Sequence, residues 1–205
     1  MVSPQENRGL GGDATADRLT RTMSDVFQIL QMAAESRGLD FLLIGGHAVN
    51  AHGYARTTLD VDLLARESQR EEWKRCLAEV GYRLIHETTV FAQFDPVHPG
   101  EMNLDLMFVD EPTFAKLLAG KTSLPVGGSV LPVAGVLHLI ALKLHALRSE
   151  TRSEGKDFYD VVNLMRLHQI DPTEASAHEI LERYATTDLR QRLLAELARP
   201  PGSKL

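Results

Sequence analysis

Apolar and polar positions follow two periods along this chain, and the changes of period divide it into predicted helices and strands. Apolar residues three or four apart predict a helix, whereas alternation or a short apolar run predicts a strand. The first apolar stripe predicts a helix from about residue 20 to Arg37, which Gly38 can end. Residues 1–18, which are polar and Gly-rich, are predicted to be a disordered lead-in.

The middle of the chain carries the strand patterns, with helices between them. Strands are predicted over residues 41–44, 59–63, 82–85, 90–94, 102–108, 123–126 and 129–132. Helices are predicted over residues 47–54, 68–80 and 111–119. The second of these begins with Ser68-Gln69-Arg70-Glu71, whose spacing is that of a capping box.

After residue 135 the pattern is helical. Helices are predicted over residues 136–148 and 154–168, followed by one that starts at Asp171-Pro172 and one that Thr187 caps. Because several strands follow one another directly before the helices take over, this order predicts an α+β fold with a small mixed sheet flanked by helices. The predicted division is a core over residues 19–135 and a helical C-terminal part over residues 136–199, packed on the core.

Composition narrows the classes of function. The length of 205 residues suits one domain with a small helical appendage. A single cysteine, Cys76, excludes an internal disulfide framework and a multi-cysteine zinc site. The formal net charge of -6 argues against wrapping a long nucleic acid. The chain shows neither a secretory signal nor an apolar run of transmembrane length, so a cytoplasmic protein without a membrane partner is expected.

The candidate chemistry is concentrated in residues 41–64. Gly45-Gly46 follows a predicted buried strand and permits a tight turn. Asp60 and Asp62, two apart on the next predicted strand, share one face, while Leu59 and its alternate neighbours are predicted to face the core. Two carboxylates aimed at one point repel each other unless a cation lies between them, and such hard ligands suit Mg²⁺ or Mn²⁺. The alternative is that the acids lie at a strand edge and face solvent.

The order of these motifs resembles the signature of the nucleotidyltransferase superfamily related to DNA polymerase β. That signature is a strand, a Gly-Gly or Gly-Ser turn, a short helix and an Asp-x-Asp strand, with a third acid on a later strand. Here the third acid is Asp105, between Leu104 and Leu106. Two further stretches, Arg56-Thr57-Thr58 and Lys156-Asp157-Phe158-Tyr159-Asp160, resemble the AbiEii-like, toxin-type branch.

The resemblance covers roughly residues 40–165 and extends to the small antibiotic nucleotidyltransferases. It implies the same fold, a mixed-sheet core with a helical C-terminal part. It also implies a metal-dependent enzyme that moves a nucleoside monophosphate from an NTP to an acceptor hydroxyl. The acceptor would be an RNA 3′ end such as that of a tRNA, a protein side chain, or a small molecule.

The resemblance assigns roles to individual residues. Two ions of Mg²⁺ or Mn²⁺ would be held by the catalytic acids Asp60, Asp62 and Asp105, the last of which would help to deprotonate the acceptor. Candidates for nucleotide binding are Gly45, Gly46, Arg56, Lys143, Lys156 and Asp157. The turn and the helix that follows it would cradle the triphosphate with backbone N–H groups.

Alternatives remain open at this point. Arg56 would contact phosphate or pair with a surface acid. Lys143, in an otherwise apolar helix, would bind phosphate or form an ion pair with Asp157 or Asp160 that locks two helices. Three hypotheses remain for the function of the whole chain: an enzyme, an inactive nucleotidyltransferase-fold binding module, or one member of a toxin–antitoxin pair with an antitoxin partner. A metal-dependent phosphohydrolase is a further reading that uses the same acids.

Overall fold

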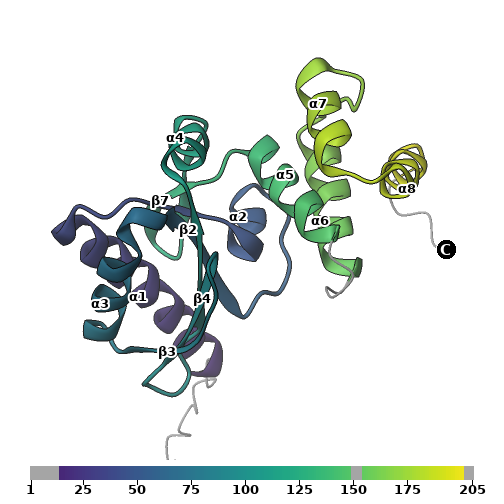
Figure 1. The fold of residues 1–205 in the computed structure, drawn as a ribbon. Coiled ribbons are helices and arrows are strands. Elements are labelled where there is room, and N and C mark those ends of the chain that lie inside the picture. The colour runs from purple at the N-terminus through teal and green to yellow at the C-terminus, as the bar shows by residue number, and fades with distance from the viewer. Residues whose placement is uncertain (1–13, 149–153, 201–205) are drawn as a thin grey trace, which may run out of the picture.

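The computed structural model describes residues 14–148 and 154–200, and a seven-stranded mixed sheet forms its centre (Figure 1). The strand order is β3-β4-β5-β2-β1-β7-β6. The pairs β2–β5 and β1–β7 are parallel and the other pairs are antiparallel, which confirms the predicted mixed sheet. The strands are β1 Phe41–Leu43, β2 Asp60–Arg66, β3 Tyr82–Glu87, β4 Phe91–Pro96, β5 Asn103–Val109, β6 Thr122–Val126 and β7 Ser129–Val133.

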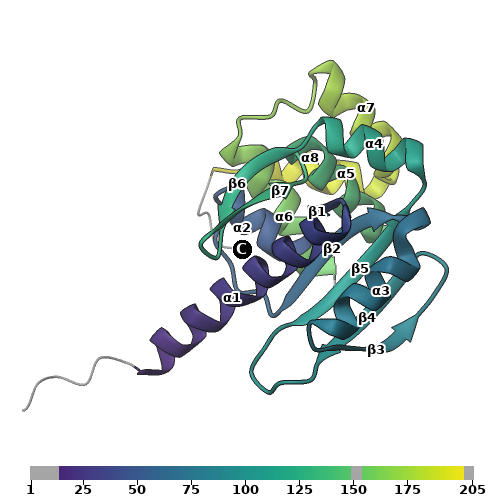
Figure 2. The ribbon, with the colours of Figure 1, turned by 90° about the vertical axis from the view of Figure 1, so that its left-hand side faces the viewer.

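Helices flank the sheet on both faces. The views in Figures 1 and 2 place α1 and α3 over one face, with α2 and α5 on the other side. The last three helices form a further layer behind α5, farthest from the sheet (Figure 1). The helices are α1 Ala14–Arg37, α2 Gly45–Ala51, α3 Arg70–Glu79, α4 Glu111–Ala119, α5 Val136–Leu147, α6 Glu154–Leu167, α7 Ala175–Tyr184 and α8 Thr187–Leu197.

The burial of β2 changes along its length, and this change positions the site. Val61 and Leu63 are fully buried. Asp60, which precedes Val61, is exposed, and Asp62, which lies between the two apolar residues, is partly buried. From Leu64 onward both faces are covered, because α4 packs Phe114 against the second face. The acids therefore occupy the half of the strand that α4 leaves uncovered.

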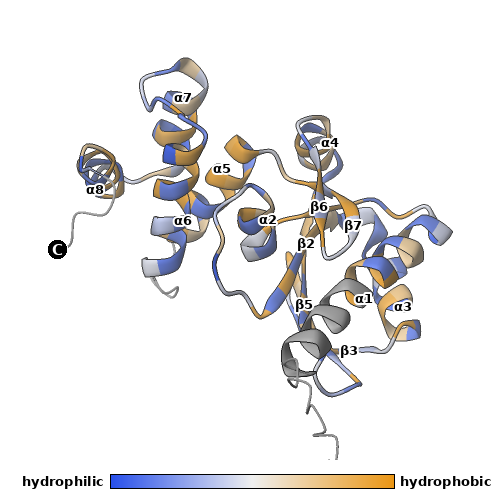
Figure 3. Cartoon of the chain, turned by 180° about the vertical axis from the view of Figure 1, so that it is seen from behind, coloured by the Kyte–Doolittle hydropathy of each residue, from blue (hydrophilic) through white to orange (hydrophobic). Residues whose placement is uncertain are grey.

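The apolar surface of α5 reflects its position between other elements. Figure 3 shows α5 as apolar along most of its length, whereas α6 and α8 are mixed. This helix packs against α2 on one side and against α6 and α7 on the other. Within the part of the chain that the structure describes, no helix is both long and apolar enough to cross a membrane.

Some predicted boundaries are wrong. Helix α1 already begins at Ala14, so residues 14–18 are helical, while the rest of the predicted lead-in lies outside the described residues. Helix α2 begins at Gly45 rather than at residue 47, so the glycine pair forms its first turn. Leu59 lies before β2 and is 73% exposed, so it does not face the core.

Three cap predictions are also wrong. The capping box does not form, because Glu67–Gln69 is a short 3₁₀ helix and Gln69 caps α3 without a side-chain bond. Asp171 accepts hydrogen bonds from the backbone and hydroxyl of Thr173, in a turn that precedes the start of α7. Thr186, not Thr187, caps α8. In the last two cases the capping side chain is present, but Asp171 satisfies a turn and the neighbouring threonine takes the cap position of α8.

Candidate active site

Asp62 and Asp105 are direct cross-strand neighbours. The parallel register of β2 and β5 pairs Asp62 with Asp105, and the residues on either side of them pair in step. Leu104 and Leu106 are fully buried, so the alternate side chain, Asp105, points to the opposite face of the sheet. Two carboxylates from different strands thus meet on one face.

Burial and the neighbouring acid change the acidity of Asp62. Burial, followed by the charge of Asp105, raises the pKa of Asp62 from 3.8 to about 6. The charge of Lys143 and a hydrogen bond from the Gly46 N–H oppose this rise in pKa. Asp105 in turn accepts a hydrogen bond from the side chain of Gln93 at 3.3 Å.

Asp60 lies two residues before Asp62, and its charge adds to the rise in the pKa of Asp62, after the larger effects of burial and of Asp105. It is exposed at the first position of β2 and pairs in register with Asn103. Oxygen donors from Asp62 and Asp105 fit a hard divalent cation in chemical type, and their mutual repulsion favours one. Among residues 14–148 and 154–200, however, no group of three or more His, Cys, Asp or Glu side chains lies close enough together to hold a metal ion.

The glycine pair is packed against these groups. Gly45 has a φ of +64°, and a Cβ built there would lie 1.8 Å from Oδ2 of Asp62. A Cβ on Gly46 would lie 2.4 Å from Oγ1 of Thr58. Only glycine lets the Asp62 carboxylate and the loop before β2 approach the backbone this closely.

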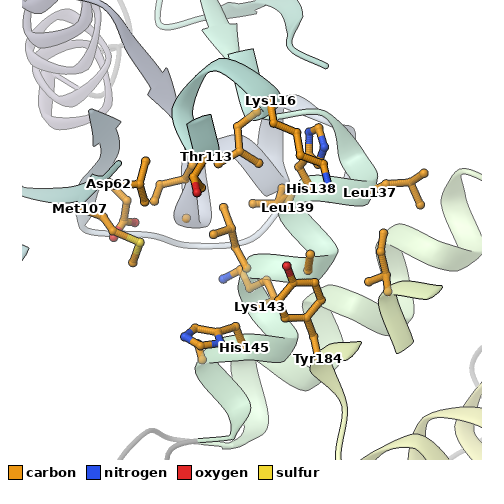
Figure 4. Close-up of a pocket in the computed structure, with 18 of the residues that line it drawn as sticks. Asp62, Met107, Thr113, Lys116, Leu137, His138, Leu139, Lys143, His145 and Tyr184 are labelled. Atoms are coloured by element: carbon orange, nitrogen blue, oxygen red, sulfur yellow. The ribbon is translucent and has the colours of Figure 1, made fainter. Parts of the chain in front are cut away.

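A cavity of about 850 Å³ opens beside the acids. In Figure 4, Asp62 and Met107 lie on one wall and Lys143, His145 and Tyr184 on the other, below Lys116 and His138. Five of the predicted site residues line it, namely Gly45, Asp62, Asp105, Lys143 and Asp157. Four others do not line it, namely Gly46, Arg56, Asp60 and Lys156.

Several cavity residues carried no sequence signal. They come from α4, α5 and α7, and include Thr113, Lys116, His138, Arg183 and Tyr184. Burial lowers the pKa of His138, and the charge of nearby Lys116 acts in the same direction. None of these residues belongs to a recognisable motif, so only the packing of the helices could reveal them.

Lys143 lies at the centre of an ion-pair network. Its Nζ is 2.6 Å from Oδ1 of Asp157 and 2.8 Å from Oδ2 of Asp160. Asp160, which is fully buried, also receives two hydrogen bonds from the guanidinium of Arg56. The ion-pair readings of Arg56 and Lys143 therefore have structural support, although the partner of Arg56 is a buried acid and not a surface one. Lys156 is exposed.

Several solved structures share this fold. The chain is similar to ANT(2″)-Ia in complex with adenylyl-2″-tobramycin, at 17% identity over 79% of this chain and 98% of that one, with a TM-score of 0.62. It is also similar to an antigenic nucleotidyltransferase-like protein from Paracoccidioides brasiliensis, at 18% identity over 89% of this chain and 93% of that one, with a TM-score of 0.55. At such low identity these likenesses show a shared fold alone.

Comparison by sequence supplies the family. A search of curated proteins finds no match. The family described as "Nucleotidyl transferase AbiEii toxin, Type IV TA system" matches residues 28–202, which include the sheet, the cavity and the C-terminal helices. The protein therefore belongs to the AbiEii nucleotidyl transferase toxin family.

Proposed function

We propose that this protein transfers a nucleoside monophosphate from an NTP to the hydroxyl of an acceptor. The observation that carries the proposal is the cavity in which Asp62 faces Lys143 from the opposite wall (Figure 4). Asp105, the cross-strand neighbour of Asp62, lines the same cavity. Nucleotidyl transfer requires negative charge to be neutralised around the phosphates and a proton to be removed from the acceptor. The two walls supply groups for both tasks.

The residues of the chain divide these tasks. Lys143 places its ammonium group at the cavity and binds the triphosphate, with Asp157 holding the amine in position. The backbone at Gly45 lines the same cavity, next to the Asp62 carboxylate, so a phosphate bound there would lie beside both. Asp105 accepts the proton of the acceptor hydroxyl.

The acids are also the proposed metal ligands. Asp62 and Asp105, with Asp60 at the open end of β2, would hold Mg²⁺ or Mn²⁺. When bound, the ions neutralise phosphate charge and lower the pKa of the attacking hydroxyl. The carboxylate oxygens are of the chemical type that suits the metal. Burial, and then the charge of Asp105, raise the pKa of Asp62, and a bound cation would favour its charged form against both effects.

We propose a small molecule or the 3′ end of an RNA such as tRNA as the acceptor. A volume of about 850 Å³ lies within the range of small-ligand sites and suits a ligand or a chain end better than a folded surface. In a toxin role, the modification would arrest growth and an antitoxin partner would counter it. The family match supports this role.

One experiment tests the activity. The purified protein is incubated with Mg²⁺ or Mn²⁺, each α-labelled NTP in turn, and total RNA, total protein or aminoglycoside and lincosamide drugs. Label should transfer to one acceptor class, and Asp62→Asn should abolish the transfer. A metal- and NTP-dependent rise in melting temperature without any transfer would instead support an inactive binding module. Neither transfer nor a rise in melting temperature would overturn the proposed function.

A further inference from the structure

A buried chain of polar contacts connects the loop before β2 to Lys143. Arg56 donates from Nε to Oδ1 of Asp160 at 2.7 Å and from Nη2 to Oδ2 at 2.9 Å. The same Oδ2 lies 2.8 Å from Nζ of Lys143. One carboxylate, 1% exposed, is therefore shared by a cation from the core and a cation from α5.

The backbone of Arg56 is clamped from α2. Oδ1 of Asn50 accepts a hydrogen bond from the Arg56 N–H, and Nδ2 of Asn50 donates one to the Arg56 carbonyl, each with a length of 2.9 Å. A Cβ on Gly46 would lie 3.1 Å from Nη1 of Arg56, so the side chain also rests against the glycine turn. These contacts determine where the guanidinium meets Asp160.

The division of Asp160 between two cations determines how strongly it holds Lys143. A planar guanidinium satisfies both carboxylate oxygens, and such bidentate contacts are strong and directional. With Arg56 in place, Lys143 is one of two cations on Asp160, and its ammonium group remains at the cavity wall. Without Arg56, the buried carboxylate would depend on Lys143 and draw the ammonium away from the cavity, because an unpaired buried charge is costly.

We propose that Asn50 and Arg56 are positioning residues for nucleotide binding. They act through Asp160 to keep Lys143 available to the triphosphate, and they do not touch the nucleotide. Arg56 does not line the cavity, and its Nε and Nη2 are already bonded to Asp160, which argues against direct phosphate contact. The inference rests on the proposed function, since it concerns how that same site binds an NTP.

The test compares the removal of Arg56 with the removal of the whole Arg56–Asp160 pair. Affinity for a non-hydrolysable ATP, GTP, CTP or UTP analogue with Mg²⁺ is measured by calorimetry, and urea denaturation checks each fold. Arg56→Met should weaken binding by about tenfold or more, equal to roughly 1.4 kcal/mol. Adding Asp160→Asn to Arg56→Met should restore most of the affinity, because the neutral side chain no longer competes for Lys143.

A second variant keeps every charge in place. Asn50→Ala removes only the clamp on Arg56 and should weaken binding of the same analogue severalfold. The matched control is Asn163→Ala, which removes a similar amide-to-backbone bond, an exposed one on α6 to the carbonyl of Tyr159, that includes neither Arg56, Asp160 nor Lys143. Affinity in the control should equal that of the wild type. This variant keeps the proposal testable if Arg56→Met does not fold.

The outcomes separate the two proposals. Wild-type protein that binds no analogue overturns the proposed function and this inference with it. If the wild type binds the analogue and the Arg56→Met and Asn50→Ala variants bind it with the same affinity as the wild type, the inference fails but the proposed function stands. If the double variant stays as weak as Arg56→Met, Arg56 contacts the nucleotide or ties the elements together, and the positioning role is rejected.

Discussion

Replacing Asp62 by Asn should make the stability of this protein less dependent on pH. Burial and the Asp105 charge raise the pKa of Asp62 from 3.8 to about 6, so between these values the native state binds more protons than the unfolded chain. Stability must then fall as the pH rises through this window. Asn carries no charge at any pH, so the variant lacks this contribution and retains an oxygen that can accept from the Gly46 N–H.

The magnitude follows from the size of the shift. A rise in pKa of about two units corresponds to roughly 3 kcal/mol of lost stability once the pH is well above 6. This value is a ceiling, because Asp62 keeps part of its surface towards the cavity. The stability of the variant relative to the wild type should therefore increase by up to about 3 kcal/mol as the pH rises from 4 to 7, and should then stay constant at higher pH.

Urea denaturation in the presence of a chelator, repeated at several pH values from 4 to 8, measures this effect. The informative quantity is the difference in unfolding free energy between variant and wild type, because contributions of distant groups cancel. Asp188→Asn is the matched control, since it makes the same substitution at a carboxylate that is 80% exposed on α8 and does not line the cavity. A difference that stays flat across this pH range for Asp62→Asn would refute the reasoning about the acid pair.

Three further predictions concern the same cavity. Asp105→Asn should reduce the rate of transfer more than it reduces NTP affinity, since the residue accepts a proton; steady-state kinetics with a binding titration checks this, and an equal loss in both contradicts it. Lys143→Ala should weaken NTP binding about tenfold or more. It should lower the free energy of unfolding by less than the ~3–5 kcal/mol expected when a buried charge is left alone, because Arg56 keeps Asp160 paired. Calorimetry and urea denaturation measure the two effects, and a loss of stability with unchanged NTP affinity would reject the prediction. Gly45→Ala should destabilise the protein by about 3 kcal/mol or more, because its Cβ would overlap Asp62, whereas Gly38→Ala, with a similar φ of +63° and no atom within 4 Å, should cost less; equal losses in unfolding free energy would count against the close approach.

Short-range patterns in the sequence determined the elements and the faces of their side chains. The sequence predicts a helix over residues 111–119, and α4 spans Glu111–Ala119. The Asp110 side chain caps it by accepting a hydrogen bond from the Thr113 N–H, a contact that depends only on residues three apart. Likewise, alternation along β5 places Asp105 opposite to Leu104 and Leu106, whatever the strand pairs with. The Gly-Gly and Asp-x-Asp motifs carried the family resemblance for the same reason.

Tertiary structure alone decided which of these residues meet. The parallel register of β2 and β5 puts Asp105 beside Asp62 and leaves Asp60 exposed, and a register is set by the packing of whole strands. Arg56 and Asp160, which are 104 residues apart, form a pair that no local pattern reveals. The far wall of the cavity also depends on where α7 packs, because its residues have no motif of their own. Local sequence patterns thus identify the acids, whereas the packing of distant elements forms the cavity around them.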